Sequence, residues 1–489
     1  PWWAVGISTM ATQTSAVSFI SIPAFVALKP GGGMTWLQYE LAVPLAMIIT
    51  SIALLPFFRQ LKLISVYAYL EMRFGPSVRS LVSAVFLLSR SLGTAVGLYA
   101  SAIILTVMLD LPVWSTILLM SVFTIIYDTI GGIKAVVFSD VIQMFILLVG
   151  ILFSIGFALK FAGGMDMMLD SIHPERLKAL DFTLGIEDGS STPFWGFLVG
   201  GLFLYIAYYG TDQSQVQREL SASTLEGTRR SLYFNGYVRF PLTLLYVFFG
   251  LCLGAVYEKS AMYQEQVPME FLDFLVPVFI LEFLPAGVRG ILIAALLAAS
   301  MSSLDSALNS LSAATMRDFI DKWFDLSSKQ TLFVGKVTTV VWGCLIAGFA
   351  LVVGGISDTV IESINKIGST FYGPILAAFL IGLLSRRAST GGMLIGIISG
   401  VTFNLTLWIF FPGTFWMWWN LSGVLVAGSV TMMLSLILPP PKPEQIEGYT
   451  LAGSGFFQGQ KIWNRAHTIL VLYFCCILLF MFWLNTLAG

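Results

Sequence analysis

Long apolar stretches separated by short polar connections recur along the whole chain. Each stretch is about 18 residues or longer, the length that a helix needs to cross roughly 30 Å of hydrocarbon. The alternation of apolar and polar residues that a membrane barrel requires is absent from the sequence. The pattern therefore predicts an all-α, polytopic membrane protein. Its thirteen predicted spans lie near 3–28, 38–58, 80–109, 112–130, 134–161, 193–212, 232–256, 286–315, 331–354, 366–385, 391–411, 415–438 and 467–487.

Two of these spans carry polar residues near the membrane middle. The first reads GISTMATQTSAVSFISIP and is closed by Pro23, and the sixth opens into YIAYYGTDQSQVQR. Helices interrupted at matching places in two halves of a chain point to inverted repeats around a binding site at the membrane midplane. We expect spans one to five and six to ten to form two such halves, although no sequence identity between the halves is visible.

The expected organisation follows the spans. Residues 1–385 are predicted to form the ten-span core, and 386–438 two peripheral spans. Residues 439–466 are predicted to be a cytoplasmic linker, because they begin with PPPKPEQ and Pro-rich segments are stiff. The terminal span then occupies 467–489.

Basic residues indicate the orientation of the chain. Lys and Arg gather in connections that fall on one side, for example Arg230, Arg386 and Arg387. Because basic residues mark cytoplasmic loops, the first span is predicted to start in the cytoplasm and the C-terminus to face outward. The outer connections 162–192 and 257–285 are mixed in charge and are predicted to contain short surface helices.

The composition excludes a soluble domain and offers little for covalent chemistry. Hydrophobic residues make up 57% of the chain and charged residues 11%, and the mean hydropathy is +0.85. His173 and His467 lie outside the polar spans, and the sequence contains neither a cluster of metal ligands nor a phosphate-binding loop. We therefore expect neither an enzyme nor an ATP-driven pump, and no nucleic acid partner; the lipid bilayer is the expected surrounding.

The eighth predicted span is unusually rich in oxygen atoms. Its end, AASMSSLDSALNSLSAATMRDF (298–319), combines a carboxylate, an amide and several hydroxyls. Hard cations such as sodium prefer oxygen ligands, whereas small hydroxyl residues also serve close helix packing. A carboxylate in a span costs roughly 2.5–3.5 kcal/mol and normally marks a pathway or a partner. At 100° per residue one broad face carries Ala299, Ser302, Asp305, Ser306 and Asn309, with Ser303 at its edge.

A second carboxylate, Asp140, lies nearly two turns into the fifth span. Its surroundings read GGIKAVVFSDVIQMF, with Ser139 and Gln143 close by. Two interpretations stay open for this residue: a functional site inside the membrane, or a salt bridge to Lys134 near the cytoplasmic interface.

Four segments together resemble the signature regions of the sodium:solute symporter family. They are SVYAYLEMRFG (65–75), YDTIGGIKAVVFSDVIQ (127–143), GTDQSQVQREL (210–220) and SMSSLDSALNSLSAATMRDF (300–319). The motifs are most similar to those of the bacterial sodium/sialic acid symporters, with features of the monocarboxylate, vitamin and iodide branch. The resemblance implies a five-plus-five inverted repeat with extra C-terminal helices. Members usually carry a helix before the first core span. A chain that omits this helix would begin directly at the first core span, as this sequence does at Pro1.

The resemblance also implies where sodium binds. The main site would use the backbone carbonyls of Ala11 and Thr14, the carbonyl of Ala299 and the hydroxyls of Ser302 and Ser303. A second site, found in only some members, would use Asp140, Ser302 and Ser306. The departure from the sialic acid members is Asp305, where they have serine. That carboxylate would either strengthen cation binding or hold a proton, because a nearby like charge disfavours ionising both.

The same resemblance places a solute pocket at the first span. Gln13, Ser15, Ser18 and Gln38 would line it. Arg90 offers a fork to a carboxylate, although it falls about one helical turn from the arginine of the sialic acid members. Snorkelling, or pairing with a backbone carbonyl, is the alternative for Arg90.

These observations predict sodium-coupled symport of a small polar solute, an organic acid or sugar acid such as sialic acid, at the bacterial inner (plasma) membrane. The alternatives are a neutral sugar or polyol symporter, a transporter-like sensor and an ion channel. A channel is disfavoured because the oxygen-rich face lacks the repeated rings of carbonyls or charges that filters use.

Overall fold

The computed structural model describes residues 1–63, 65–130, 136–457 and 462–487, apart from the side chains of 127–130, 136–139, 302, 323 and 487. Within these residues the regular structure is helical, and a single isolated bridge joins Ile186 and Thr414. The predicted all-α class is confirmed.

Nine helical runs in the described residues are long and apolar enough to cross a membrane, and the bent pair α1 and α2 makes a tenth. Shorter apolar helices stand at the other predicted positions. The first half contains α1 (Trp2–Gln13), α2 (Ala16–Leu28), η1 (Met34–Glu40), α3 (Val43–Ile49), η2 (Thr50–Leu54), α4 (Leu55–Gln60), α6 (Pro76–Leu109), α7 (Val113–Ile130) and α8 (Val136–Ala162).

The second half repeats this order. It contains η4 (Gly196–Gly200), α11 (Gly201–Thr211), α12 (Gln213–Leu220), α13 (Leu225–Lys259), α16 (Ala286–Thr315), η6 (Met316–Ile320), α18 (Ser328–Val353) and α19 (Val360–Leu384). The peripheral spans are α20 (Thr390–Phe410), α21 (Trp418–Leu434) and α23 (Arg465–Leu487). In both halves the first span is broken, at residues 14–15 in the first half and at Asp212 in the second.

The break in the first span has a local cause in the sequence. The polar residues after Gln13 leave the helix, and Ser15 then caps α2, its side chain accepting a hydrogen bond from the Val17 amide (3.3 Å). The axes of α1 and α2 differ by 54° across this break. Gly250 on α13 lets α2 approach closely, because a Cβ there would lie 2.9 Å from the backbone of Pro23.

The sixth span breaks at Asp212, between α11 and α12. The Asp212 carboxylate caps α12 by accepting a hydrogen bond from the Ser214 amide (2.8 Å). Only 4% of Asp212 is exposed. Its capping role in the middle of the span explains its burial.

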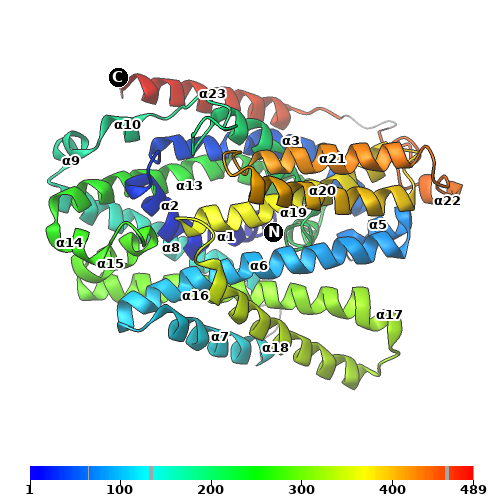
Figure 1. Cartoon of the computed structure of the whole chain (residues 1–489), viewed down its shortest axis with the longest axis horizontal. Coiled ribbons are helices and arrows are strands. Elements are labelled where there is room, and N and C mark those ends of the chain that lie inside the picture. The colour runs from blue at the N-terminus through cyan, green and yellow to red at the C-terminus, as the bar shows by residue number, and fades with distance from the viewer. Residues whose placement is uncertain (64, 131–135, 458–461, 488–489) are drawn as a thin grey trace.

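The spans run roughly along one direction, with α1 and α2 in the centre of the molecule (Figure 1). The outer connections contain the short helices α9 (Met165–Ser171), α10 (Pro174–Leu177), α14 (Ala261–Gln266), η5 (Leu272–Phe274) and α15 (Leu275–Phe283), of which α15 is largely buried rather than on the surface. They gather at one end of the spans, and the short helices α5 (Val66–Phe74), α17 (Asp321–Trp323) and α22 (Pro443–Ile446) gather at the other (Figure 1). The two ends therefore match the two membrane sides that the basic residues predict.

Candidate functional site

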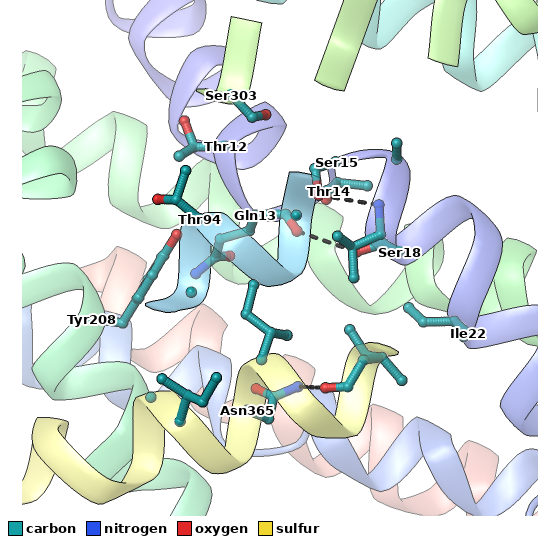
Figure 2. Close-up of a pocket in the computed structure, with 18 of the residues that line it drawn as sticks. Thr12, Gln13, Thr14, Ser15, Ser18, Ile22, Thr94, Tyr208, Ser303 and Asn365 are labelled. Atoms are coloured by element: carbon teal, nitrogen blue, oxygen red, sulfur yellow. Dashed lines mark hydrogen bonds between the residues drawn. The ribbon is translucent and has the colours of Figure 1, made fainter. Parts of the chain in front are cut away.

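A cavity of about 170 Å³, lined by both polar and apolar residues, lies at the break of the first span. Figure 2 draws 18 of its lining residues and labels ten, with Thr12 and Ser303 at one end of the view and Asn365 at the other. Its walls come from five regions of the fold: the first span and η1, the third span α6, the sixth span α11, α13, and the pair α16 and α19. Lining residues that bear on the site are Thr12, Gln13, Thr14, Ser15, Ser18, Tyr39, Glu40, Arg90, Thr94, Tyr205, Tyr208, Asp212, Arg239, Ser303, Asn365 and Tyr372.

The break leaves carbonyl oxygens of α1 without helical partners. The last helical bond of α1 runs from the Thr14 amide to the Met10 carbonyl (2.9 Å). The carbonyl of Ala11 and those that follow therefore face a chain that has left the helix. The Gln13 carbonyl instead accepts a hydrogen bond from the Ser18 hydroxyl (3.2 Å), and the Gln13 side chain accepts one from Tyr209 (2.7 Å). Gln13, Ser15 and Ser18 all line the cavity, as the sequence predicted.

The eighth span, α16, presents Ser303 to the same cavity. The Ser303 hydroxyl donates a hydrogen bond to the Ala299 carbonyl (3.0 Å), so these two predicted ligands are in contact. Ala299 is buried, and the side chain of Ser302 lies outside the described residues. The structure thus brings Thr14 and Ser303 to one cavity.

Asp140 is buried against α1 and belongs to a different cluster. It accepts a hydrogen bond from the Ser8 hydroxyl (2.7 Å). Nearby, Arg218 on α12 donates a hydrogen bond to the Ser306 hydroxyl (2.6 Å) and attracts the Asp140 charge. The structure thus gathers Asp140 and Ser306 around a guanidinium group that the sequence did not predict there. Lys134, the alternative partner of Asp140, lies outside the described residues.

Asp305 is engaged within its own helix. Its carboxylate accepts a hydrogen bond from the Asn309 side chain one turn away (2.9 Å), and 7% of the residue is exposed. Asp305 is not among the residues that line the cavity. Its position on α16 still places it next to Ser306 in sequence.

Arg90 on α6 reaches the cavity from the third span. Its Nε atom has no hydrogen-bond partner among the described residues, and the charge of Asp212 and the Tyr208 hydroxyl lie close to it. Both of these neighbours also line the cavity. A guanidinium with an unused N–H donor at a cavity is suited to donate hydrogen bonds to a carboxylate.

Gln38 does not line the cavity, and this prediction was wrong. Its amide donates hydrogen bonds to the carbonyls of Thr192 (2.7 Å) and Thr35 (3.2 Å), and its oxygen accepts one from the Asp181 amide (3.0 Å). The residue is fully buried. Gln38 fastens the second span to the outer connection 162–192, a contact across the fold that local sequence does not reveal.

The sequence reasoning missed a buried ion pair in the cavity wall. Glu40 of η1 and Arg239 of α13 are joined at 2.6 Å, with exposed side-chain fractions of 2% and 8%. Beside them the Tyr39 hydroxyl donates a hydrogen bond to the Asn365 side chain (2.8 Å). A signal was present, because single charges of opposite sign stand in the apolar runs 38–58 and 232–256.

Two five-span halves, each opening with a broken helix beside this cavity, define an inverted-repeat secondary transporter embedded in the membrane by many spans. The chain belongs to the sodium:solute symporter family, which residues 1–400 match. A solved sodium-coupled sialic acid symporter, in a substrate-bound outward-open state, is similar with a TM-score of 0.75 and 26% identity, over 90% of this chain and 91% of that one. A nucleobase-cation-symport-1 family transporter shares the fold, with a TM-score of 0.54 at 14% identity over 96% of each chain. The predicted five-plus-five fold is confirmed.

Curated relatives cover most of this chain. The sodium-coupled monocarboxylate transporter 1 of Xenopus laevis is 30% identical over 412 residues, which make up 83% of this chain and 64% of that protein. The human sodium/iodide cotransporter is 28% identical over 83% of this chain and 62% of its own length. The sodium/sialic acid symporter NanT of Aliivibrio fischeri is 30% identical over 84% of this chain and 80% of its own. This chain therefore spans less than two thirds of the monocarboxylate and iodide relatives.

Proposed function

We propose that this protein imports a small organic acid or sugar acid, such as sialic acid, by sodium-coupled symport with alternating access. The observation that carries the proposal is the cavity at the break of the first span, with Arg90 on one wall and Ser303 on another. The relatives support it, because their names join sodium to a monocarboxylate or to sialic acid. Residues 1–385 are proposed as the transport core, 386–438 and 467–489 as peripheral spans, and 439–466 as the linker between them.

The main sodium site is proposed at the carbonyls of Ala11, Thr14 and Ala299 and the hydroxyls of Ser302 and Ser303. The end of the α1 hydrogen-bond ladder at Met10 supports the first two, because a buried carbonyl without an amide partner needs another positive group. Sodium is a hard cation that prefers oxygen ligands, and every member of this set offers oxygen.

The solute site is proposed between the first span and α6. Gln13, Ser15 and Ser18 would supply polar contacts, and Arg90 would bind the carboxylate of the solute through its fork of N–H donors. The aromatic rings that line the cavity, among them Tyr39, Tyr208 and Tyr372, suit the apolar face of a small ring or chain while their hydroxyls suit its polar groups.

A second sodium site is proposed at Asp140, Ser302 and Ser306, with Asp305 as a neighbour. The Arg218 guanidinium bound to Ser306 opposes a second cation there, because like charges repel strongly in a buried setting. A second sodium ion would therefore have to displace Arg218 from Ser306.

The number of ions decides how strongly an acid can be accumulated. A tenfold sodium gradient contributes about 1.4 kcal/mol per ion, and 100 mV of membrane potential adds about 2.3 kcal/mol per net charge moved. One sodium ion with a monoanion moves no net charge, so it supports only about tenfold accumulation. A second sodium ion would raise the achievable accumulation by a further factor of roughly several hundred. Whether the Asp140 cluster binds sodium therefore decides how strongly the acid can be concentrated.

A thermal-unfolding screen tests the proposal on the purified protein. Sialic acid, lactate, nicotinate and neutral sugars would each be added in sodium chloride and in choline chloride. We expect one acid to raise the unfolding temperature in sodium and not in choline, and Arg90→Gln to lose that response while keeping the stabilisation by sodium alone. Equal stabilisation of both proteins by a neutral sugar, or an acid effect that does not need sodium, would contradict the proposal.

A further inference from the structure

Several hydrogen bonds hold the Glu40–Arg239 ion pair in place. Arg239 donates hydrogen bonds to both Glu40 oxygens, from Nη2 (2.6 Å) and from Nε (3.2 Å). Glu40 also accepts hydrogen bonds from Thr243 (2.9 Å) and from Tyr205 (3.3 Å). This bidentate geometry fixes the guanidinium plane, which a single contact would leave free to rotate.

The remaining Arg239 contact points to the break of the first span. Its Nη1 atom donates a long hydrogen bond of 3.4 Å to the Thr14 hydroxyl. Thr14 is the residue at which α1 ends, with φ −97° and ψ 67°, outside the helical range. The guanidinium thus connects η1 and α13, both of which line the cavity, to the one point of the first span where the helix is interrupted.

Resting on the sodium symport proposed above, we propose that Arg239 is a positioning residue that holds Thr14 so that its backbone carbonyl faces the sodium ion. Glu40 fixes Arg239, and Arg239 fixes the Thr14 side chain. The group that would bind sodium, the Thr14 carbonyl, is attached to the same Cα atom as this side chain. The ion pair also forms part of the cavity wall. A solute that contacts this wall and a sodium ion at the break would therefore affect the same hydrogen bonds of Arg239, which couples their binding.

The geometry separates this role from simple support of the fold. A supporting ion pair needs only its charge, whereas positioning needs the fork that reaches Glu40 and Thr14 at once. Lysine keeps the charge but lacks that fork. Thr14→Val removes the hydroxyl that Arg239 contacts, and it keeps the Thr14 carbonyl, the side-chain shape and the whole Glu40–Arg239 pair.

The test is a sodium titration of the purified full chain without any solute. The thermal unfolding temperature would be followed as sodium chloride replaces choline chloride at constant ionic strength. We expect wild type to be stabilised by sodium, and Arg239→Lys and Thr14→Val each to need about five-fold or more sodium for half of the effect, since each loses a hydrogen bond with a charged partner. Arg239→Met should show at least the same shift.

Arg79→Met is the matched control. Arg79, near the start of α6, forms another largely buried ion pair, with Asp318 at 2.5 Å, and neither residue lines the cavity. Its loss should lower the unfolding temperature without changing the sodium midpoint. If Arg239→Lys and Thr14→Val keep the wild-type midpoint while wild type responds to sodium, the positioning role is overturned and the symport proposal survives. A wild type that sodium does not stabilise would overturn both.

Discussion

At the residue scale, Ser303 and Ser310 offer a direct comparison on one helix. Ser303 lines the cavity and bonds to the Ala299 carbonyl, whereas Ser310 bonds to the Ser306 carbonyl and is not a lining residue. Ser303→Ala should weaken sodium binding roughly five- to 150-fold, because losing one ligand at a buried polar centre costs about 1–3 kcal/mol. The sodium dependence of thermal stability measures this change.

Ser310→Ala is the control for that substitution. It removes the same hydroxyl group from the same helix, and we expect a wild-type sodium midpoint. Equal loss in both variants would show that the hydroxyls serve helix packing, as the alternative interpretation of this span holds.

Asp140 gives a second prediction at this scale. Asp140→Asn keeps the shape and the acceptor for Ser8 but removes the charge that favours a cation and that balances Arg218. We expect fewer sodium ions to be carried per solute, seen as a changed reversal potential of transport. Asp305→Asn is the comparison, since Asp305 is engaged by Asn309 and should have the smaller effect. An unchanged reversal potential in Asp140→Asn would leave Asp140 a structural partner of Ser8.

The sequence predicted those site residues whose signal is local. The polar first span and the hydroxyl-rich eighth span could be read from neighbouring letters, and Gln13, Ser18 and Ser303 do line the cavity. Gln38 was misplaced, and Arg218 and the Glu40–Arg239 pair were missed, because their roles depend on partners more than 85 residues away. Periodicity indicates a face of a helix, but it does not say which helix meets that face.

At the element scale, the outer ends of α2 and α19 are tied together. Lys29 at the end of α2 forms ion pairs with Asp358 and with Glu362 (3.3 Å), at the start of α19. The Ser21 side chain also accepts a hydrogen bond from the Ile361 amide (2.9 Å). Both helices line the cavity, so these contacts join two of its walls at the ends of the helices that are predicted to face outward.

Lys29→Met should therefore favour opening toward the outside. We expect a cysteine placed at Ser18, in a background without the native cysteines, to react faster with a membrane-impermeant maleimide added outside. Lys259→Met is the control, because Lys259 is another outer lysine that bonds to the Ala162 carbonyl rather than to α19. Equal labelling in all three proteins would show that these ion pairs do not hold the outer side closed.

The outer helix η5 adds a pH dependence at the same place. Burial raises the pKa of Asp273 to about 6. Hydrogen bonds from Ser21 and from the Val360 amide oppose this rise, whereas the charge of Glu362 adds to it. A carboxyl whose pKa is higher in the folded state than in the unfolded chain lowers the free energy of unfolding once it ionises. That loss develops as pH rises from about 4 to 6 and persists above it.

Asp273→Asn removes this penalty and keeps an acceptor for the Val360 amide. We expect the variant to be more stable than wild type by on the order of 2 kcal/mol at pH 7.5, with the difference shrinking toward pH 5. Thermal unfolding of both proteins between pH 5 and pH 8 measures it. A difference that does not vary with pH would assign the effect to packing.

The sequence predicted where spans lie better than how they are built inside. The second span was expected as one helix over 38–58, but it is divided into η1, α3, the π-helical segment η2 and α4. Pro44 is the second residue of α3 and cannot continue a preceding α-helix, because it lacks the amide hydrogen. Apolar length sets the position of a span, whereas such interruptions depend on proline and on packing.

At the scale of the whole molecule, Thr14 and Ser303 of the proposed main sodium site line the same cavity as Arg90, and both halves contribute to its walls. Sodium at the break of the first span and an acid at Arg90 would then favour the same conformations, which couples their binding. The central claim is that the sodium gradient drives import of the acid.

Uptake into proteoliposomes tests this claim most directly. The acid identified by the thermal screen would be supplied outside vesicles that contain no sodium, with the membrane potential held at zero. The account predicts that an inward sodium gradient drives the acid above its equilibrium level and that potassium in place of sodium does not. Equal uptake in potassium at zero membrane potential would contradict sodium-coupled symport.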